Sequence, residues 1–215
     1  SERDQVARAL QRARRRIERH RFQGIVSVCP YYNRPSQDGM REHFTRIAEA
    51  TDRQILIYNI PYRTSVNLAN DTLLRLAELP NIVGVKDSSG SLAQSLDLLR
   101  RRPRGFAVMT GDDAMLYTTL AHGGDGGILA SAHVGTERFL DVHAGMAAND
   151  YRGALARWTR LESLIALLFR EANPMPLKHC LWRQGLIASP ECRLPLTRIS
   201  PELADDLDRA VKALD

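Results

Sequence analysis

The sequence contains few cysteines, and their spacing argues against two common classes of site. Cys29, Cys180 and Cys192 are an odd number and form no C-x-x-C pattern, which disfavours both a disulfide framework and a structural zinc site. The six histidines show no H-x-x-x-H or H-E-x-x-H pattern, so no metal site is predicted. Cysteines without a pairing scheme are typical of a reducing compartment, and the predicted location is the cytoplasm.

Long hydrophobic runs are also missing. No apolar run approaches the length of about 18 residues that a membrane helix needs, and the first residues, SERDQVARAL, lack the apolar core of a signal peptide. The chain has 215 residues, of which 44% are hydrophobic and 26% are charged. These values are ordinary for a globular protein with a large core, and no membrane partner is predicted.

Aromatic residues are absent from the most basic stretch of the chain. The net charge of +5 owes much to the run RALQRARRRIERHR at 8–21, which raises the hypothesis of a basic α/β protein that binds nucleic acid. Val6, Leu10, Ala13 and Ile17 recur at helical spacing and predict the inner stripe of an amphipathic helix. The arginines then occupy its solvated face, with no rings for base stacking, so no nucleic-acid partner is predicted.

Short apolar stretches alternate with helical patterns along the first two thirds of the chain. This alternation predicts a parallel sheet with helices on both faces. Beyond residue 140 no further strand is predicted, and the remaining patterns are helical. Strands are predicted at 24–30, 54–61, 81–87, 105–111 and 126–131, and helices at 37–51, 69–79, 91–101, 112–124, 138–150, 151–170 and 174–187.

Polar or special residues follow each predicted strand, as they do at the active rim of a (β/α)₈ TIM barrel. That fold needs eight strands and typically ~250 residues, whereas five strands are predicted here. We therefore expect an α/β fold in which residues 1–140 form a partial barrel, strands 4 to 8, and roughly three further βα units precede them. Residues 141–215 are expected to form a C-terminal helical subdomain.

Lysine is the scarcest charged residue, and one lysine has an unusual place. The chain has 27 arginines but only three lysines, and Lys86 ends the apolar stretch of NIVGVKDSSG at 81–90. A buried amine can lose its proton, because desolvation lowers its pKa, and it then attacks ketones to form a Schiff base, whereas a guanidinium stays charged. The alternative is a structural lysine whose side chain extends into solvent from the exposed end of the strand. This stretch alone does not decide between them.

Five motifs in order give the chain a recognisable pattern: PYYNRPSQDGMREHF, YNIPYRTSVNL, IVGVKDSSG, TGDDA and ANPMPLKHCLWRQGLI…CRLPLT. Together they resemble the dihydrodipicolinate synthase family, relatives of N-acetylneuraminate lyase, from about residue 24 onward. The resemblance implies a class I aldolase-type enzyme on a (β/α)₈ barrel, which joins or splits pyruvate through a lysine Schiff base. It also implies no cofactor, and a homodimer or homotetramer.

The resemblance assigns roles to individual residues. Lys86 is the implied Schiff-base lysine, Tyr58 its proton shuttle, and Tyr32 the residue that completes a proton relay in a neighbouring subunit. Arg63 offers a planar fork for a carboxylate. The implied catalytic residues are Lys86, Tyr58 and Tyr32, and the implied substrate-binding residues are Arg63, Thr64, Ile128 and Gly111.

The second substrate stays open at this point. The arginine of YNIPYRT favours aspartate semialdehyde, whose carboxylate must be held, and so a 4-hydroxy-tetrahydrodipicolinate synthase of lysine biosynthesis. The alternatives are an aldolase of 2-keto-3-deoxy sugar acids, N-acetylneuraminate or 4-hydroxy-2-oxoglutarate, and, in another class, a non-catalytic pyruvate-binding or structural relative. The family's G-T-T-G-E motif is absent from these residues, and we expect it to belong to the second barrel strand, upstream.

Two features are interpreted as structural. Asp112 and Asp113 could form a metal pair, but TGDDAM also opens a helix, and a helix cap is predicted. Cys29 lies just before the tyrosine pair and is predicted to be a small apolar filler rather than a nucleophile.

Overall fold

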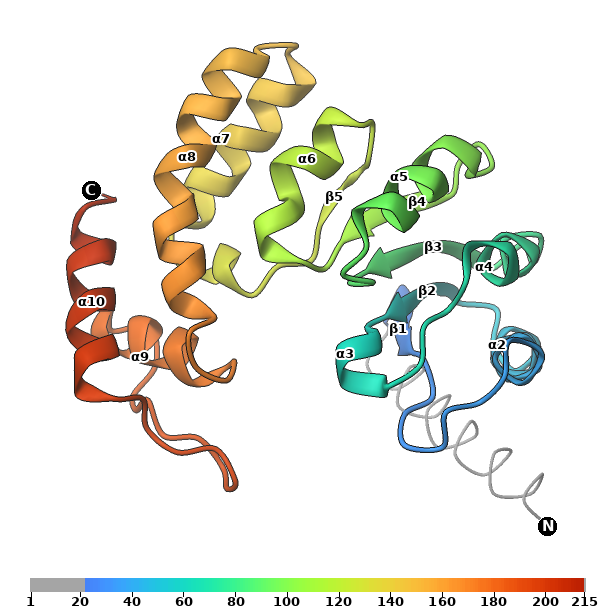
Figure 1. The fold of residues 1–215 in the computed structure, drawn as a ribbon, viewed down its shortest axis with the longest axis horizontal. Coiled ribbons are helices and arrows are strands. Elements are labelled where there is room, and N and C mark those ends of the chain that lie inside the picture. Colours follow the sequence, from blue (N-terminus) through green and yellow to red (C-terminus); the bar gives the residue numbers. More distant parts are fainter. Residues whose placement is uncertain (1–21, 215) are drawn as a thin grey trace. The chain divides into compact units, whose positions relative to one another are not determined.

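The computed structural model describes residues 22–214 (Figure 1). These residues divide into two compact units between Met109 and Thr110. The amphipathic helix predicted from Val6 to Ile17 lies outside the described residues. The predicted division into residues 1–140 and 141–215 concerns the barrel and its C-terminal helices, and it stays a prediction.

Within residues 22–214, five strands form a single sheet in the order β1-β2-β3-β4-β5. Strand β1 pairs in parallel with β2, and β2 in parallel with β3, so the predicted parallel pairing is confirmed for these strands. The predicted helices on both faces are wrong for the first unit, because the face opposite its helices carries the exposed Val26 and Val28. The last two strands are shorter than the predictions at 105–111 and 126–131, because glycines flank or form them and offer no side chains to pack. The strands are β1 (Gly24–Val28), β2 (Gln54–Asn59), β3 (Ile82–Asp87), β4 (Ala107–Thr110) and β5 (Gly126–Gly127).

Two of the described helices of the first unit begin at serine caps. Ser36 caps the first of them by accepting a hydrogen bond from the Gly39 N–H, and Ser91 caps the last by accepting from the Gln94 N–H. The four-residue helix α3 was not predicted, because it is too short to show a periodic pattern. The helices are α2 (Gln37–Glu49), α3 (Pro61–Thr64), α4 (Asn70–Leu76) and α5 (Leu92–Arg101).

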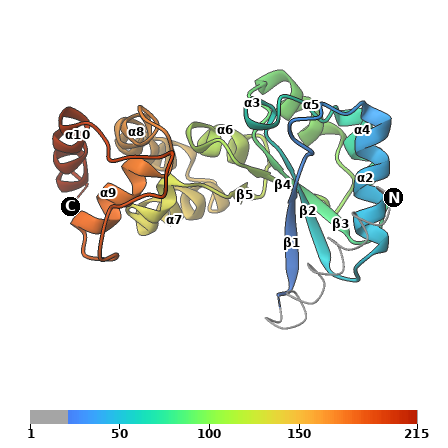
Figure 2. The same ribbon diagram turned by 90° about the horizontal axis from the view of Figure 1, so that it is seen from below.

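The core of the first unit lies on one face of the sheet. In Figure 2, α2 and α4 lie along one side of strands β1 to β3. Each buried aliphatic or aromatic side chain contributes about 1.5–3 kcal/mol, so this face holds the unit together. Its core includes Met40, Phe44, Ile55, Ile57, Leu73, Leu76, Val85, Leu98 and Val108.

The second unit is mainly helical. Helices α7 and α8 pack through Phe139 and Trp158, whose rings meet edge to face, and α10 packs through Leu203 and Leu207. Helix α10 was not predicted, although its serine cap and proline start are visible in the sequence. The elements are η1 (Asp113–Met115), α6 (Leu116–Ala121), η2 (Ser131–His133), α7 (Thr136–Ala147), α8 (Tyr151–Leu168), α9 (Met175–Arg183) and α10 (Pro201–Lys212).

Within residues 22–214, no helix is both long enough and apolar enough to cross a membrane.

Candidate active site

Lys86 and Tyr58 meet at the carboxyl ends of two neighbouring strands. Each is the last residue but one of its strand, and they are paired in the parallel ladder of β3 and β2. The Lys86 Nζ atom lies over the Tyr58 ring, 4.1 Å from the ring centroid. Both residues are half-buried. The structure therefore brings together the predicted Schiff-base lysine and its predicted proton shuttle.

A β-bulge sets this pairing. Ile82 lies opposite Ile55, but Gly84 lies opposite Leu56, so Val83 is an extra residue in β3. An inserted residue moves every later side chain of its strand to the other face, because strand side chains alternate.

The bulge determines which face of the sheet carries the amine. In an unbroken ladder Lys86 would lie opposite Asn59, which is buried on the side of the helices. The extra residue Val83 instead places Lys86 opposite Tyr58, on the face away from that core. A reactive amine needs access to its substrate, and the bulge supplies it.

The loop after β1 carries the predicted relay residue Tyr32. Its side chain is 91% exposed and its φ is 72°, in the left-handed region that a bulky residue rarely adopts. The neighbouring Tyr31 is also exposed. An exposed aromatic pair on a strained backbone is typical of a functional or interface loop. The predicted role of Tyr32 stays a prediction.

Arg63 and Thr64 lie in α3, directly after β2. Arg63 is exposed, and its guanidinium lies 5.2 Å from the centroid of the Tyr62 ring. Thr64 is buried, and its hydroxyl lies within hydrogen-bonding distance of the Ile60 and Val66 carbonyls. Its side chain thus braces the turn that carries Arg63. The predicted contacts of both residues with substrate stay predictions.

Gly111 and Ile128 belong to the second unit and follow β4 and β5. The Ile128 N–H donates to the Thr110 carbonyl at 2.8 Å, and the Ile128 side chain is 39% exposed. Their predicted contacts with pyruvate likewise stay predictions.

The two structural interpretations fare differently. Asp112 caps η1 by accepting from the Ala114 N–H, as predicted, but Asp113 is buried and accepts from the Ser131 N–H at 2.6 Å and from its hydroxyl at 2.5 Å. Cys29 is fully buried, and this burial raises the pKa of its thiol to about 12. Its predicted role as an apolar filler is confirmed, since a thiol in that state is a poor nucleophile.

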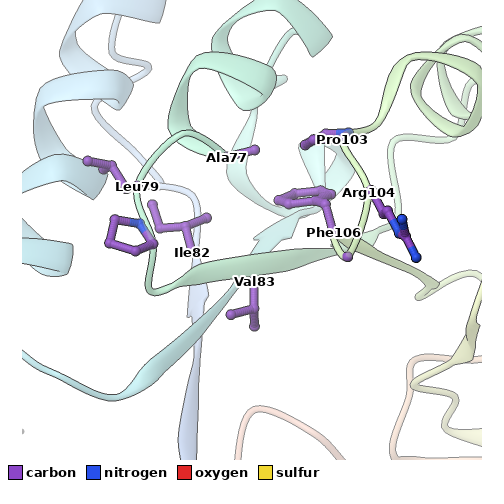
Figure 3. A pocket seen from close by; sticks show the side chains of 9 residues that line it. Ala77, Leu79, Ile82, Val83, Pro103, Arg104 and Phe106 are labelled. Atoms are coloured by element: carbon purple, nitrogen blue, oxygen red, sulfur yellow. The ribbon is translucent and has the colours of Figure 1, made fainter.

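A pocket of about 180 Å³ lies at the other end of β3 from Lys86 (Figure 3). Ile82 and Phe106, at the amino ends of β3 and β4, contribute to its lining together with Arg104. Because barrel enzymes react substrates at the carboxyl ends of their strands, this pocket is not the candidate active site. Among residues 22–214, no group of three or more histidine, cysteine, aspartate or glutamate side chains could hold a metal ion.

One residue of the candidate site was missed by the sequence analysis. Asn59 follows Tyr58 and is 2% exposed, with its amide hydrogen-bonded to the loop at residues 67–68. An amide in an otherwise apolar strand was the available signal, because buried polar groups need partners.

Comparison with known proteins identifies the relatives of the chain. Residues 5–214 match the model of the Dihydrodipicolinate synthetase family. The 4-hydroxy-tetrahydrodipicolinate synthase 2 of Clostridium acetobutylicum is 51% identical over 193 residues, which are 90% of this chain and 68% of that protein. The 4-hydroxy-tetrahydrodipicolinate synthase of Laribacter hongkongensis is 43% identical over 189 residues, which are 88% of this chain and 65% of that protein.

Solved structures give the same result for the fold. The crystal structure of dihydrodipicolinate synthase from Aquifex aeolicus matches with a TM-score of 0.86 at 36% identity, covering 89% of this chain and 66% of that chain. This confirms the predicted α/β class, a (β/α)₈ barrel to which the described residues contribute five strands, with a C-terminal helical subdomain. The chain spans about two thirds of the length of these three relatives.

Proposed function

The chain belongs to the dihydrodipicolinate synthetase family, and we propose on that basis that its protein condenses pyruvate with aspartate semialdehyde through a Schiff base on Lys86. The product would be 4-hydroxy-tetrahydrodipicolinate, an intermediate of lysine biosynthesis. The observation that carries the proposal is the approach of the Lys86 amine to the Tyr58 ring at the strand ends. The names of the relatives support the choice of reaction.

The chemistry follows from the two side chains. The neutral Lys86 amine attacks the ketone carbon of pyruvate, and loss of water from the carbinolamine gives an imine. Removal of a proton from the pyruvate methyl group gives an enamine, whose carbon attacks the aldehyde and forms the new carbon–carbon bond. The Tyr58 hydroxyl carries protons between these species, with Tyr32 extending the relay. The amino group that came from aspartate semialdehyde then attacks the imine carbon, which closes the ring of the product and displaces the Lys86 amine.

The nature of the second substrate rests on Arg63. A guanidinium binds a carboxylate through two parallel hydrogen bonds, and aspartate semialdehyde brings a second carboxylate to a site that already holds pyruvate. The exposed position of Arg63, on the helix that directly follows β2, supports this assignment. The alternative second substrates are the aldehydes that combine with pyruvate to give 2-keto-3-deoxy sugar acids. We call these the sugar-acid aldehydes, and the experiment below compares them directly with aspartate semialdehyde.

Tyr32 supports a proposal about assembly. An exposed pair of tyrosines is a common interface element, and Tyr31 and Tyr32 are 68% and 91% exposed. We propose that this loop packs against a second copy of the protein in a homodimer, alone or within a tetramer. Sedimentation of the Tyr32→Ser variant should then show a shift toward monomer, and an unchanged oligomer would contradict the interface.

We further propose that the reaction takes place in the cytoplasm. Free Cys29, Cys180 and Cys192 support this location, because a reducing compartment keeps thiols unpaired.

Borohydride trapping tests the central step. Reduction of the protein with pyruvate should leave one reduced pyruvate covalently bound to Lys86, identified by peptide mass spectrometry. The Lys86→Arg variant should give no adduct, because a guanidinium forms no imine. Lys178→Arg is the matched control, and it should be labelled like the wild type.

The outcomes separate the candidate functions. An adduct on Lys86, together with faster turnover of aspartate semialdehyde than of sugar-acid aldehydes, supports the synthase. An adduct with the opposite preference would favour the sugar-acid aldolase. A folded protein that gives no adduct at Lys86 would overturn the Schiff-base mechanism and leave a non-catalytic relative.

A further inference from the structure

The loop that follows Arg63 and α3 is held by side-chain amides from three different elements. We call the side chains of Gln37, Asn59, Asn67 and Gln94 the amide cage. Gln37 lies at the start of α2, Asn59 at the end of β2, and Gln94 in the first turn of α5. These three side chains reach loop residues 67–69, and the side chain of Asn67 in that loop pairs with two of them.

Asn59 holds the loop from the sheet side. Its Oδ1 atom accepts a hydrogen bond from the Leu68 N–H at 3.1 Å, and its Nδ2 atom donates to Asn67 Oδ1 at 2.9 Å. Asn59 is 2% exposed, so water cannot easily replace these partners. The amide therefore ties the loop to the residue that directly follows Tyr58.

Gln37 holds the same loop from α2. Its Nε2 atom donates to the Asn67 carbonyl at 2.8 Å, and its Oε1 atom accepts from the Ala69 N–H at 3.0 Å. A single side chain thus pairs with main-chain groups of two residues, in the manner of a neighbouring strand. This contact fixes the direction of the main chain as well as its position.

Gln94 completes the amide cage from α5. Its Nε2 atom donates to the Leu68 carbonyl at 3.0 Å, and its Oε1 atom accepts from Asn67 Nδ2 at 2.8 Å. The Leu68 main chain is therefore bonded on both its N–H and its carbonyl side. The Asn59 Nδ2 atom also lies 3.4 Å from the Leu68 carbonyl, so Leu68 is bonded from both the sheet and α5.

Helix α3, which carries Arg63, is closed by its own hydrogen bonds and leads directly into the loop. The Arg63 N–H donates to the Ile60 carbonyl at 3.0 Å, and the Ser65 N–H donates to the Pro61 carbonyl at 2.7 Å. The Thr64 hydroxyl lies 2.9 Å from the Val66 carbonyl. Only residues 64–66 separate Arg63 from the amide cage, so we expect a shift of residues 67–69 to move the main chain at Arg63 as well.

We infer that Gln37, Asn59 and Gln94 are positioning residues, which act through Arg63 to set the affinity for the carboxylate of the acidic aldehyde. The inference rests on the proposed function. It separates the two half-reactions: the amide cage governs binding of the aldehyde, whereas capture of pyruvate depends on Lys86 and Tyr58. A misplacement of about 1 Å in a binding group can lower the rate by up to about 100-fold, so even small movements of the loop are measurable.

The test uses Gln94 variants of the full protein. Gln94→Leu removes both hydrogen-bonding atoms, and Gln94→Glu keeps the shape but replaces the donor to Leu68 with an acceptor. Both should raise KM for aspartate semialdehyde about tenfold or more, while KM for pyruvate and the rate of borohydride-trapped adduct at Lys86 stay unchanged. Gln184→Leu, an exposed glutamine at the end of α9, is the matched control and should change neither.

A double-mutant cycle shows whether the amide cage acts through Arg63. In an Arg63→Ala background, Gln94→Leu should add nothing further to KM for the aldehyde, because coupled residues are not additive. Should Gln94→Leu unfold the protein, Gln37→Glu perturbs the same loop from α2 and is expected to give the same split.

The possible results are distinguishable. Normal adduct formation with an unchanged KM for the aldehyde in the Gln94 variants would overturn the inference and leave the proposed function standing. An additive effect in the Arg63→Ala background would also overturn it. A wild-type protein that forms no adduct at all would overturn the proposed function, and the inference with it.

Discussion

The amine of Lys86 lies over the face of the Tyr58 ring, 4.1 Å from its centroid, and the two residues are paired across β3 and β2. The ring and its hydroxyl can therefore be tested separately. Tyr58→Phe keeps the aromatic face beneath the amine and removes only the group proposed to carry protons. Tyr58→Leu removes both.

Tyr58→Phe should slow Schiff-base formation by about 10²–10⁴-fold, the usual contribution of a positioned acid or base. The measurement is the rate at which the trapped pyruvate adduct accumulates on Lys86. Tyr117→Phe, which removes a tyrosine hydroxyl that donates to the Tyr151 carbonyl in the second unit, is the control and should leave the rate unchanged. A Tyr58→Phe rate equal to that of the wild type would contradict the proton-carrying role.

Gly84→Ala should destabilise the first unit. An added Cβ atom would lie 2.4 Å from the Ala107 carbonyl oxygen and 2.9 Å from the Ala107 Cβ, so β3 and β4 would have to separate. Overpacking of this kind costs about 1–3 kcal/mol, measured as the free energy of unfolding in urea. Gly39→Ala in α2, where the nearest atom would be 3.4 Å away, should be neutral or stabilising by up to about 1 kcal/mol. Equal stability of the two variants would disprove the close approach.

The three thiols should differ in reactivity at pH 8. Burial raises the pKa of the Cys29 thiol and of the Cys180 thiol to about 12, so neither forms appreciable thiolate at that pH, whereas Cys192 is only half-buried. Alkylation with iodoacetamide should label Cys192 first in the native protein and all three residues after unfolding in guanidinium. Rapid labelling of native Cys29 would show that its site is open.

The carboxylate form of Asp97 should stabilise the protein, and this contribution should be lost in strongly acidic solution. Hydrogen bonds from Asn70, Arg100 and Arg101 lower the pKa of Asp97 from its ordinary value of 3.8 to about 2. A lowered pKa in the folded state means that the stabilising contribution is complete above pH 3.8 and disappears as the pH falls through about 2.

The comparison of Asp97→Asn with the wild type measures this contribution. The variant should have a slightly lower Tm at pH 7, since the carboxylate is partly solvated, and the difference should vanish between pH 3.8 and 2. Asp52→Asn, at an exposed aspartate, serves as the control, with no change in Tm at either end. A difference that persists at pH 2 would point to a cause other than charge.

The motifs at the strand ends were predictable because they combine a local pattern with a chemical requirement. Val85 and Ile82 mark a buried strand, and a lysine at its end stands out in a chain rich in arginine. The face on which Lys86 lies was not predictable in this way. Simple alternation from Ile82 would place it on the helix side, and only the pairing with β2 reveals that Val83 is the extra residue.

The convergence of the amide cage on one loop could not be predicted from the sequence either. The position of Asn59 in an apolar strand signals a hydrogen-bonded amide, but Gln37 and Gln94 reach the same loop from residues that lie 27 to 32 positions from Asn67 and Ala69. Such contacts depend on how the helices pack. Helix α10 is a different case, since the serine cap at Ser200 and the proline at Pro201 mark its start in the sequence.

Every group of the amide cage keeps the same protonation state from mildly acidic to strongly alkaline solution. The conformation of the loop beside Arg63 should therefore stay the same while the Lys86 amine and the Tyr58 phenol gain or lose protons. The pH–rate profile of the protein would then reflect the ionisation of the reacting groups, with no contribution from the amide cage that positions Arg63.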